Sequence, residues 1–158
     1  MKRLEETAAR ICDLVGDQAD AECRVTHTAH GLTRFANSHI HQHHGEDTVS
    51  VRLRVAVDGR VSAINAVGLG DDDLGGLVDQ ALEAARLQPV DPDWPGVSGP
   101  VEPARMDKVA QNTIDATPAT RAEQVAAFVE AGEGSAAAGY LDSGLTEVAL
   151  ATTGGLAV

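Results

Sequence analysis

The sequence predicts an α+β fold in which an antiparallel meander sheet packs against amphipathic helices. Two patterns predict it. Short runs in which apolar and polar residues alternate, separated by turn signals, indicate strands joined by hairpins. Segments with an apolar residue at every third or fourth position indicate helices. The chain has 158 residues, of which 43% are hydrophobic. That length suits one core, so we expect residues 1–158 to form a single α+β domain.

The clearest strand covers residues 48–57, where five apolar side chains alternate with polar ones, so that one face is buried and the other is wet. Asp58-Gly59 is a strong signal for a two-residue hairpin, and residues 60–67 form the return strand. The other predicted strands are residues 21–29, 32–43, 136–142 and 145–152. Turns are expected at His30-Gly31, at residues 44–47 and around Ser143-Gly144.

Amphipathic helices are predicted on both sides of these strands. Asp71 is a suitable N-cap for a helix over residues 72–87, which we expect to cover the buried face of the sheet. Thr117 and Pro118 have the residue types of an N-cap and a first helical position. The inner stripe of that helix is Ala122, Val125, Ala126 and Val129, and Gly132-Glu133-Gly134 ends it. Further helices are expected at residues 3–15 and 106–114, and an extended, proline-rich segment at residues 88–104.

Composition excludes several classes of partner. The net charge of −12 repels phosphate backbones and anionic lipid, so we expect neither nucleic acid nor a membrane as a partner. No run approaches the roughly 20 apolar residues that span a bilayer. The start of the chain has no secretory signal, and Cys12 and Cys23 are not in a C-x-x-C motif. These features predict a cytoplasmic protein with buried, free thiols.

A cluster of histidines is the most conspicuous polar feature. On a strand, His39, His41 and His43 project from one face, and three imidazoles can bind zinc, copper or nickel. Same-face side chains lie about 6.5–7 Å apart along a strand, however, so a compact metal cage needs a bend or other ligands. A polar, exposed strand face is the favoured interpretation, and a small metal-binding protein is the alternative.

Other motifs point to a protein without catalytic residues of its own. Neither HExxH, HExxxH nor G-x-S-x-G occurs. The glycines at 68, 70, 75 and 76 do not have the spacing of a phosphate-binding loop, so we interpret them as part of a helix start. Arg34-Phe35-Ala36-Asn37 places an aromatic residue among polar strand residues, where it would line a groove for extended peptide or form an ordinary edge strand.

The run from Arg34 to Gln42 resembles the "R-[FW]-A-N-[ST]-x-[IV]-x-Q" strand of TldD/PmbA proteins. The hairpin at residues 49–60 resembles that family's "v-x-v-r-v-x-x-x-G-r" pattern. An acidic-capped helix, a "dpdwpg" segment at residues 91–96 and a Thr117-Pro118 helix start follow in the same order. The chain is therefore identified as similar to the amino-terminal domain of this family, some members of which carry the historical name modulator of DNA gyrase.

The resemblance implies a function. TldD and PmbA (TldE) subunits are implicated as a heterodimeric metalloprotease, a hydrolase that degrades unfolded peptides. Its zinc ligands lie in the carboxy-terminal half of TldD-type subunits, in an HExxxH motif that this chain lacks. The resemblance thus implies an inactive chain with no cofactor of its own and with the metal-bearing domain absent. It would shape a groove for unfolded peptide and take part in a homo- or heterodimer with a TldD/PmbA-type subunit.

Four residues are the predicted peptide-binding surface: Arg34, Phe35, Asn37 and Gln42. Main-chain pairing of the peptide with a sheet edge would supply affinity, and these side chains would add selectivity. At the end of the chain the family's "N-S-x-G" turn reads Thr152-Thr153-Gly154-Gly155, which departs from the pattern. A structural module that oligomerises through its acidic sheet remains a further alternative.

Overall fold

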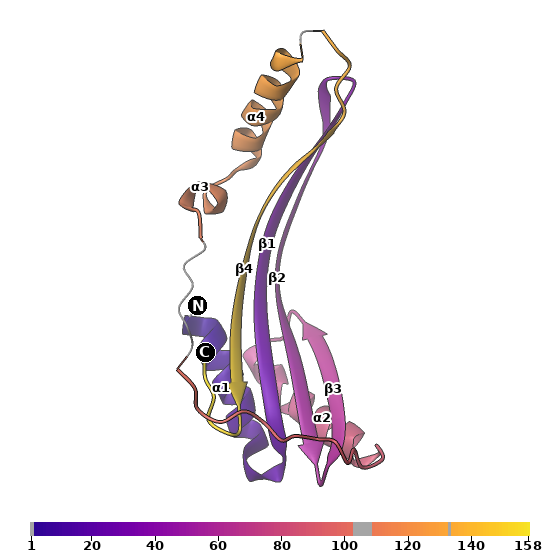
Figure 1. The fold of residues 1–158 in the computed structure, drawn as a ribbon, viewed down its shortest axis with the longest axis vertical. Helices are drawn as coiled ribbons and strands as arrows, with labels where there is room; N and C mark the ends of the chain where they lie inside the picture. The colour runs from indigo at the N-terminus through magenta and orange to yellow at the C-terminus, as the bar shows by residue number, and fades with distance from the viewer. Residues whose placement is uncertain (1, 103–108, 133) are drawn as a thin grey trace. The chain divides into compact units, whose positions relative to one another are not determined.

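The computed structural model describes residues 2–102, 109–132 and 134–158, and it confirms the α+β class. Within these ranges, four antiparallel strands form one sheet in the order β3-β2-β1-β4 (Figure 1). The strands are β1 Asp20–Ala36, β2 His39–Val57, β3 Arg60–Val67 and β4 Gly139–Thr152. The α-helices of the described ranges are α1 Lys2–Val15, α2 Leu74–Arg86, α3 Gln111–Ile114 and α4 Pro118–Ala131, with 3₁₀ turns at Gly16–Gln18 and Asp71–Asp73.

The chain divides into two compact units. The first unit comprises residues 1–27, 48–105 and 147–158. The second unit comprises residues 28–47 and 106–146. Strands β1, β2 and β4 contribute residues to both units, β3 belongs to the first, and α3 and α4 belong to the second.

The first unit holds the main hydrophobic core, and its helices and inner strands follow the predicted patterns. α2 packs on β3 and on α1. The apolar stripe that helical spacing predicts for α2 is buried and consists of Leu74, Leu77, Val78, Ala81, Leu82 and Ala85. In β2, Leu53 and Val55 are fully buried while Arg52 between its buried neighbours is exposed, as the alternation predicts. The buried face of α1 consists of Leu4, Ala8, Ile11, Cys12 and Val15.

The hairpin between β2 and β3 is confirmed in detail. Asp58 has φ of 49° and Gly59 has φ of 73°, the left-handed conformations that a type I′ turn requires. The register runs from the pair Val57↔Arg60 to the pair Ser50↔Val67. The prediction that Asp71 caps α2 is wrong in detail, because it is the Asp73 carboxylate that accepts a hydrogen bond from the Gly70 N–H at 3.3 Å.

The predicted turns at His30-Gly31 and at residues 44–47 are wrong, since β1 and β2 run through them without interruption. Neither His30 nor Gly31 has the positive φ that a tight hairpin turn needs. The polar residues 44–47 are exposed on a strand, and exposure accounts for their polarity as well as a turn would. The chain reverses instead inside the predicted strand 32–43, at Asn37 (φ 49°) and Ser38 (φ 64°).

The carboxy-terminal strand prediction also needs correction, because β4 is one strand that passes through Ser143-Gly144. α4 begins at Pro118 as predicted, but its inner face differs from the predicted stripe. Arg121 and Val125 are its buried residues, whereas Ala126 is exposed. The short helix expected at residues 106–114 is observed at Gln111–Ile114, and residues 106–108 lie outside the described residues.

Residues 88–102 of the proline-rich segment belong to no helix or named strand, and they include a bridge at Val90 and a turn at residues 92–93. Polar contacts attach this segment to the first unit, and residues 103–104 of the predicted segment lie outside the described residues. The Trp94 indole N–H donates to Asp20 Oδ2 at 3.2 Å. The Arg54 guanidinium lies 5.0 Å from the centroid of the Trp94 ring and donates to Glu22 Oε2 at 3.0 Å. In the described part of the chain, no helix is long and apolar enough to cross a bilayer.

Candidate functional site

The candidate site lies in the second unit and is organised by the first turn of α4. The Thr117 side chain accepts a hydrogen bond from the Thr120 N–H at 3.2 Å, and Pro118 occupies the first helical position. This confirms the predicted cap. The cap fixes where the helix begins, and it thereby places Arg121 one turn before Val125 on the face that packs on the strands. Only 4% of Arg121 is exposed.

Among the described residues, none of the hydrogen-bond partners of the Arg121 guanidinium is an acidic side chain. Nε donates to Thr33 Oγ1 on β1 at 3.3 Å. Nη1 donates to the Ala116 carbonyl oxygen at 3.2 Å and to Ser143 Oγ on β4 at 2.8 Å. Nη2 lies 3.4 Å from both ring nitrogens of His43 on β2. Three strands and the loop before α4 thus converge on one buried cation.

The guanidinium lies against the backbone of β1 at Gly31. A Cβ atom built on Gly31 would lie 2.5 Å from Arg121 Nη2 and 2.6 Å from Cζ and Nη1. Contacts that short do not occur, so any larger residue at position 31 forces the guanidinium to move. Gly31, which resembles a turn signal in the sequence, therefore leaves the space that the Arg121 guanidinium occupies.

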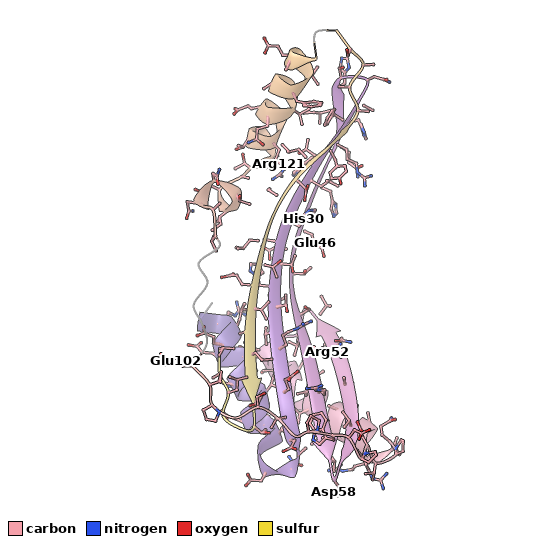
Figure 2. All side chains as sticks on the ribbon, in the orientation of Figure 1. His30, Glu46, Arg52, Asp58, Glu102 and Arg121 are labelled. Carbon is pink, nitrogen blue, oxygen red and sulfur yellow. The ribbon has the colours of Figure 1, made fainter. Side chains whose placement is uncertain are left out.

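A pocket of about 400 Å³ opens at this cluster. Arg121, His43 and Ser143 line it together with His30, whose Nε2 lies 3.4 Å from Asp142 Oδ2. Figure 2 shows the labelled residues Arg121, His30 and Glu46 on α4, β1 and β2. The acidic residues in the lining are Glu46 and Asp47.

Arg121 has no acidic partner among the residues that the structure describes. No carboxylate of those residues lies within 4.0 Å of its guanidinium, although Glu46 and Asp47 line the same pocket. A buried charge is costly unless it is paired or well hydrogen-bonded. The site therefore holds a positive charge that is neutralised by no direct contact in the described chain.

Beside the pocket, β2 presents an open strand edge. β3 pairs with Ser50–Val57, and the Gly68 N–H donates to the Val49 carbonyl oxygen at 3.0 Å. From Thr48 back to His39, no described strand lies on that side of β2. β1 pairs with the opposite side. All nine residues from His39 to Asp47 are exposed. An exposed edge of this length is a template for pairing with another extended chain.

The backbone groups that face this edge follow from the Val49 contact. The N–H and C=O of one residue in an antiparallel strand point to the same side, and the side alternates along the strand. Val49 points toward the β3 side, and regular alternation from Val49 predicts that Gly45, four residues earlier, does so too. Gly45 also lines the pocket, which places the open edge and the Arg121 cluster in one site.

The four predicted peptide-binding residues differ in their exposure. Phe35 is 7% exposed and packs edge-to-face on Phe128 of α4, with ring centroids 5.8 Å apart. Arg34 is exposed, and alternation along β1 places its side chain on the sheet face opposite to that of Phe35. Asn37 is in the hairpin turn, and Gln42 is exposed on β2. Their role in peptide binding stays a prediction.

The three histidines are exposed on β2, as the favoured interpretation predicts, and the ring nitrogens of His39 and His43 have separate neighbours. His39 Nδ1 lies 2.7 Å from the Asn37 carbonyl oxygen, and His43 Nδ1 lies 3.2 Å from Thr33 Oγ1. Within the described ranges, no three His, Cys, Asp or Glu side chains are grouped so that they could hold a metal ion.

Sequence reasoning missed Arg121, Thr33 and Ser143 as site residues. One available signal was Arg121 itself, since it is a cation four residues before Val125 on the inner side of an otherwise apolar helical stripe. A charge at such a position needs a buried polar site to receive it. Thr33 and Ser143 gave no signal, because their part in the site depends on strand continuity that the sequence misrepresented as turns.

No protein-family profile and no curated protein sequence matches the chain. Solved structures do match it. TldE from Thermococcus kodakarensis has a TM-score of 0.79 and 16% identity over 100% of this chain and 36% of its own. A "putative modulator of a DNA gyrase" from Thermotoga maritima has a TM-score of 0.77 and 16% identity over 98% of this chain and 36% of its own.

A third structure, a "putative modulator of DNA gyrase" from Bacteroides thetaiotaomicron, has a TM-score of 0.84 and 14% identity, covering 100% of this chain and 38% of its own. The chain thus spans little more than a third of the length of these proteins. At such identities the likeness concerns the fold. The chain therefore has the fold of part of TldE and of the two gyrase-modulator proteins, which is the fold that its resemblance to the TldD/PmbA family implies.

Proposed function

We propose that this chain is a non-catalytic amino-terminal domain of a TldD/PmbA-like metallopeptidase, and that the open edge of β2 binds unfolded peptide in extended form. The observation that carries the proposal is the run of nine exposed residues, His39–Asp47, beside which no described strand lies on one side of β2. An extended peptide can add there as a further strand, held by main-chain hydrogen bonds. Likeness of fold to TldE supports the family context.

The non-catalytic part of the proposal rests on the sequence. The 158 residues contain neither HExxH nor HExxxH, so this chain offers no such zinc motif. Zinc and the peptidase chemistry belong, in this proposal, to a TldD-type subunit. A peptidase assay of the chain with added divalent metal tests it. We expect no turnover, and turnover that a chelator abolishes would contradict the proposal.

Gly45 offers a matched pair of variants for the binding edge. Proline at position 45 removes the N–H that points to the open side, and edge positions tolerate proline because no ladder bond is lost. Alanine retains that N–H, and its Cβ would come no closer than 4.0 Å, to the His30 carbonyl oxygen. We expect Gly45→Pro to weaken binding of a fluorescent unfolded peptide by about tenfold or more, roughly 1.4 kcal/mol.

Gly45→Ala is expected to bind that peptide with nearly the affinity of the unchanged chain, as fluorescence anisotropy would measure. Circular dichroism melts of both variants control for folding. Equal binding by a folded Gly45→Pro variant would show that β2 does not hold the peptide through its edge.

Subunit contact is the second part of the proposed role. The second unit exposes two large aromatic side chains, Phe128 at 60% and Tyr140 at 70%. Aromatic residues are enriched in the cores of protein interfaces, so we propose that these two contact a TldD/PmbA-type subunit. Light scattering of a mixture with a TldD-type subunit tests this. Tyr140→Ser should reduce the fraction of complex, and an unchanged fraction would assign the contact elsewhere.

A further inference from the structure

The Nη2 group of Arg121 has fewer hydrogen-bond acceptors in the described chain than it has hydrogens. A guanidinium has five N–H donors, one on Nε and two on each Nη atom. Nε and Nη1 have three oxygen acceptors for their three hydrogens. Nη2 has only the His43 ring, at 3.4 Å from both nitrogens, and a neutral imidazole accepts through one nitrogen alone. At least one Nη2 hydrogen therefore has no acceptor in the described chain.

Arg121 also lacks a counter-charge among the described residues. Its four neighbours are a threonine, a serine, a histidine and a backbone carbonyl, none of which is an anion. The nearby Asp142 carboxylate lies beside His30 instead, at 3.4 Å. A cation that is 96% buried, with a spare donor and no described counter-charge, is the arrangement that an anionic ligand completes.

The lining of the pocket selects among anions. Its volume of about 400 Å³ falls within the range of small-molecule sites. Glu46 and Asp47 also line it, and the chain carries a net charge of −12. A doubly charged phosphate would be repelled more strongly than a singly charged carboxylate by these acids. A carboxylate also matches the planar geometry of a guanidinium.

We propose that the Arg121 pocket binds a carboxylate group of the peptide held on the β2 edge. This inference rests on the proposed peptide-binding function. It adds that the site prefers peptides whose terminal or side-chain carboxylate reaches Arg121. Gly45, which lies both on the edge and in the pocket lining, gives the two parts of the ligand a shared point of contact.

Three versions of one extended peptide test the proposal by calorimetry on the full chain. The first ends in a free carboxylate, the second is amidated and uncharged, and the third is amidated with one internal glutamate. We expect one or both carboxylate peptides to bind about tenfold more tightly than the neutral one. The peptide whose affinity rises shows whether the pocket binds a terminal or a side-chain carboxylate. Equal affinity for all three would overturn the proposal and leave edge binding intact.

Variants at two positions sharpen the result. Arg121→Met should abolish the preference for carboxylate. Because Arg121 is buried, that variant can fail to fold, so Glu46→Gln provides a second test on an exposed residue. Removal of the Glu46 charge should tighten binding of the preferred carboxylate peptide about two- to threefold and leave the neutral peptide unchanged. A folded Arg121→Met variant that keeps the preference would contradict the proposal.

If no peptide binds, the edge proposal fails and acetate alone tests the pocket. The buried Nε–H of Arg121 should give a distinct signal in nitrogen-15 NMR, which millimolar acetate is expected to shift. Inorganic phosphate at the same ionic strength should shift it less. A signal that acetate leaves unmoved, or that phosphate moves more, would overturn the carboxylate assignment.

Discussion

The guanidinium of Arg121 lies directly on the backbone of Gly31, so closely that a Cβ on Gly31 would be 2.5 Å from Nη2. This contact explains two features at once. It explains why β1 has a glycine in the middle of a 17-residue strand, and why α4 can bury an arginine where its stripe is otherwise apolar. Glycine in a strand often marks such a close approach.

Gly31→Ala should therefore dislodge Arg121 from its four acceptors. We expect a loss of about 1–3 kcal/mol in the free energy of unfolding, as for other overpacked sites. Urea unfolding followed by circular dichroism measures the change. Gly45→Ala on β2 is the control, since its Cβ has room. Equal stability of the two alanine variants would show that the guanidinium is not confined at Gly31.

Arg54 and Trp94 should couple the proline-rich segment to the sheet. The Arg54 guanidinium contacts both the Trp94 ring and the Glu22 carboxylate, and its buried Nε has no partner in the described chain. Arg54→Lys keeps the charge but loses the planar stacking. We expect a loss of about 0.5–1 kcal/mol and a shift in the fluorescence of Trp94, the sole tryptophan. Arg52→Lys, at an exposed position on β2, should leave the fluorescence unchanged.

Acid should weaken the first unit through Glu147 of β4. Glu147 Oε2 lies 3.0 Å from His27 Nδ1, and that hydrogen bond holds the pKa of the carboxyl below its ordinary value of 4.5. A lowered pKa in the folded state stabilises the protein above 4.5, and that contribution is lost as pH falls further. Glu147→Gln should flatten the stability profile below pH 4.5 by less than about 1 kcal/mol, because the pair is partly exposed.

Alkali should destabilise the same unit through its two thiols. Burial raises the pKa of Cys12 from 9.0 to about 11 and that of Cys23 from 9.0 to about 12. The unfolded chain releases these protons first, so stability is intact below pH 9 and declines as pH rises toward 11. Each thiol contributes roughly 1.4 kcal/mol per pH unit at most. Thermal melts of a Cys12→Ala, Cys23→Ala variant should decline less over this range, and a decline equal to that of the unchanged chain would contradict this assignment.

The first unit was largely predictable because local pattern and tertiary packing agree there. The alternation in residues 48–57 and the apolar stripe of α2 each predict a buried face from the spacing of apolar residues. Asp58-Gly59 predicts the turn between β2 and β3 from its residue types. The structure confirms all three.

The second unit was less predictable because some of its residues are small or polar for the sake of tertiary contacts or exposure. The same residue types are typical of turns. Gly31 is small to admit Arg121, and residues 44–47 are polar because the edge is exposed. The actual turn, Asn37-Ser38, lies within a run that alternates like a strand. The Arg121 cluster brings residues 33, 43 and 143 to residue 121, and no local pattern predicts contacts between residues so far apart in sequence.

The most direct test of the central claim is residue-resolved amide hydrogen exchange on β2, with and without unfolded peptide. In the free chain, the Gly45 amide should exchange rapidly because it faces the open edge, while the amides of His44 and Glu46 are protected by β1. Saturating peptide should protect Gly45 and leave its two neighbours unchanged. If peptide binds and the Gly45 amide still exchanges as fast as in the free chain, the β2 edge is not the peptide-binding site.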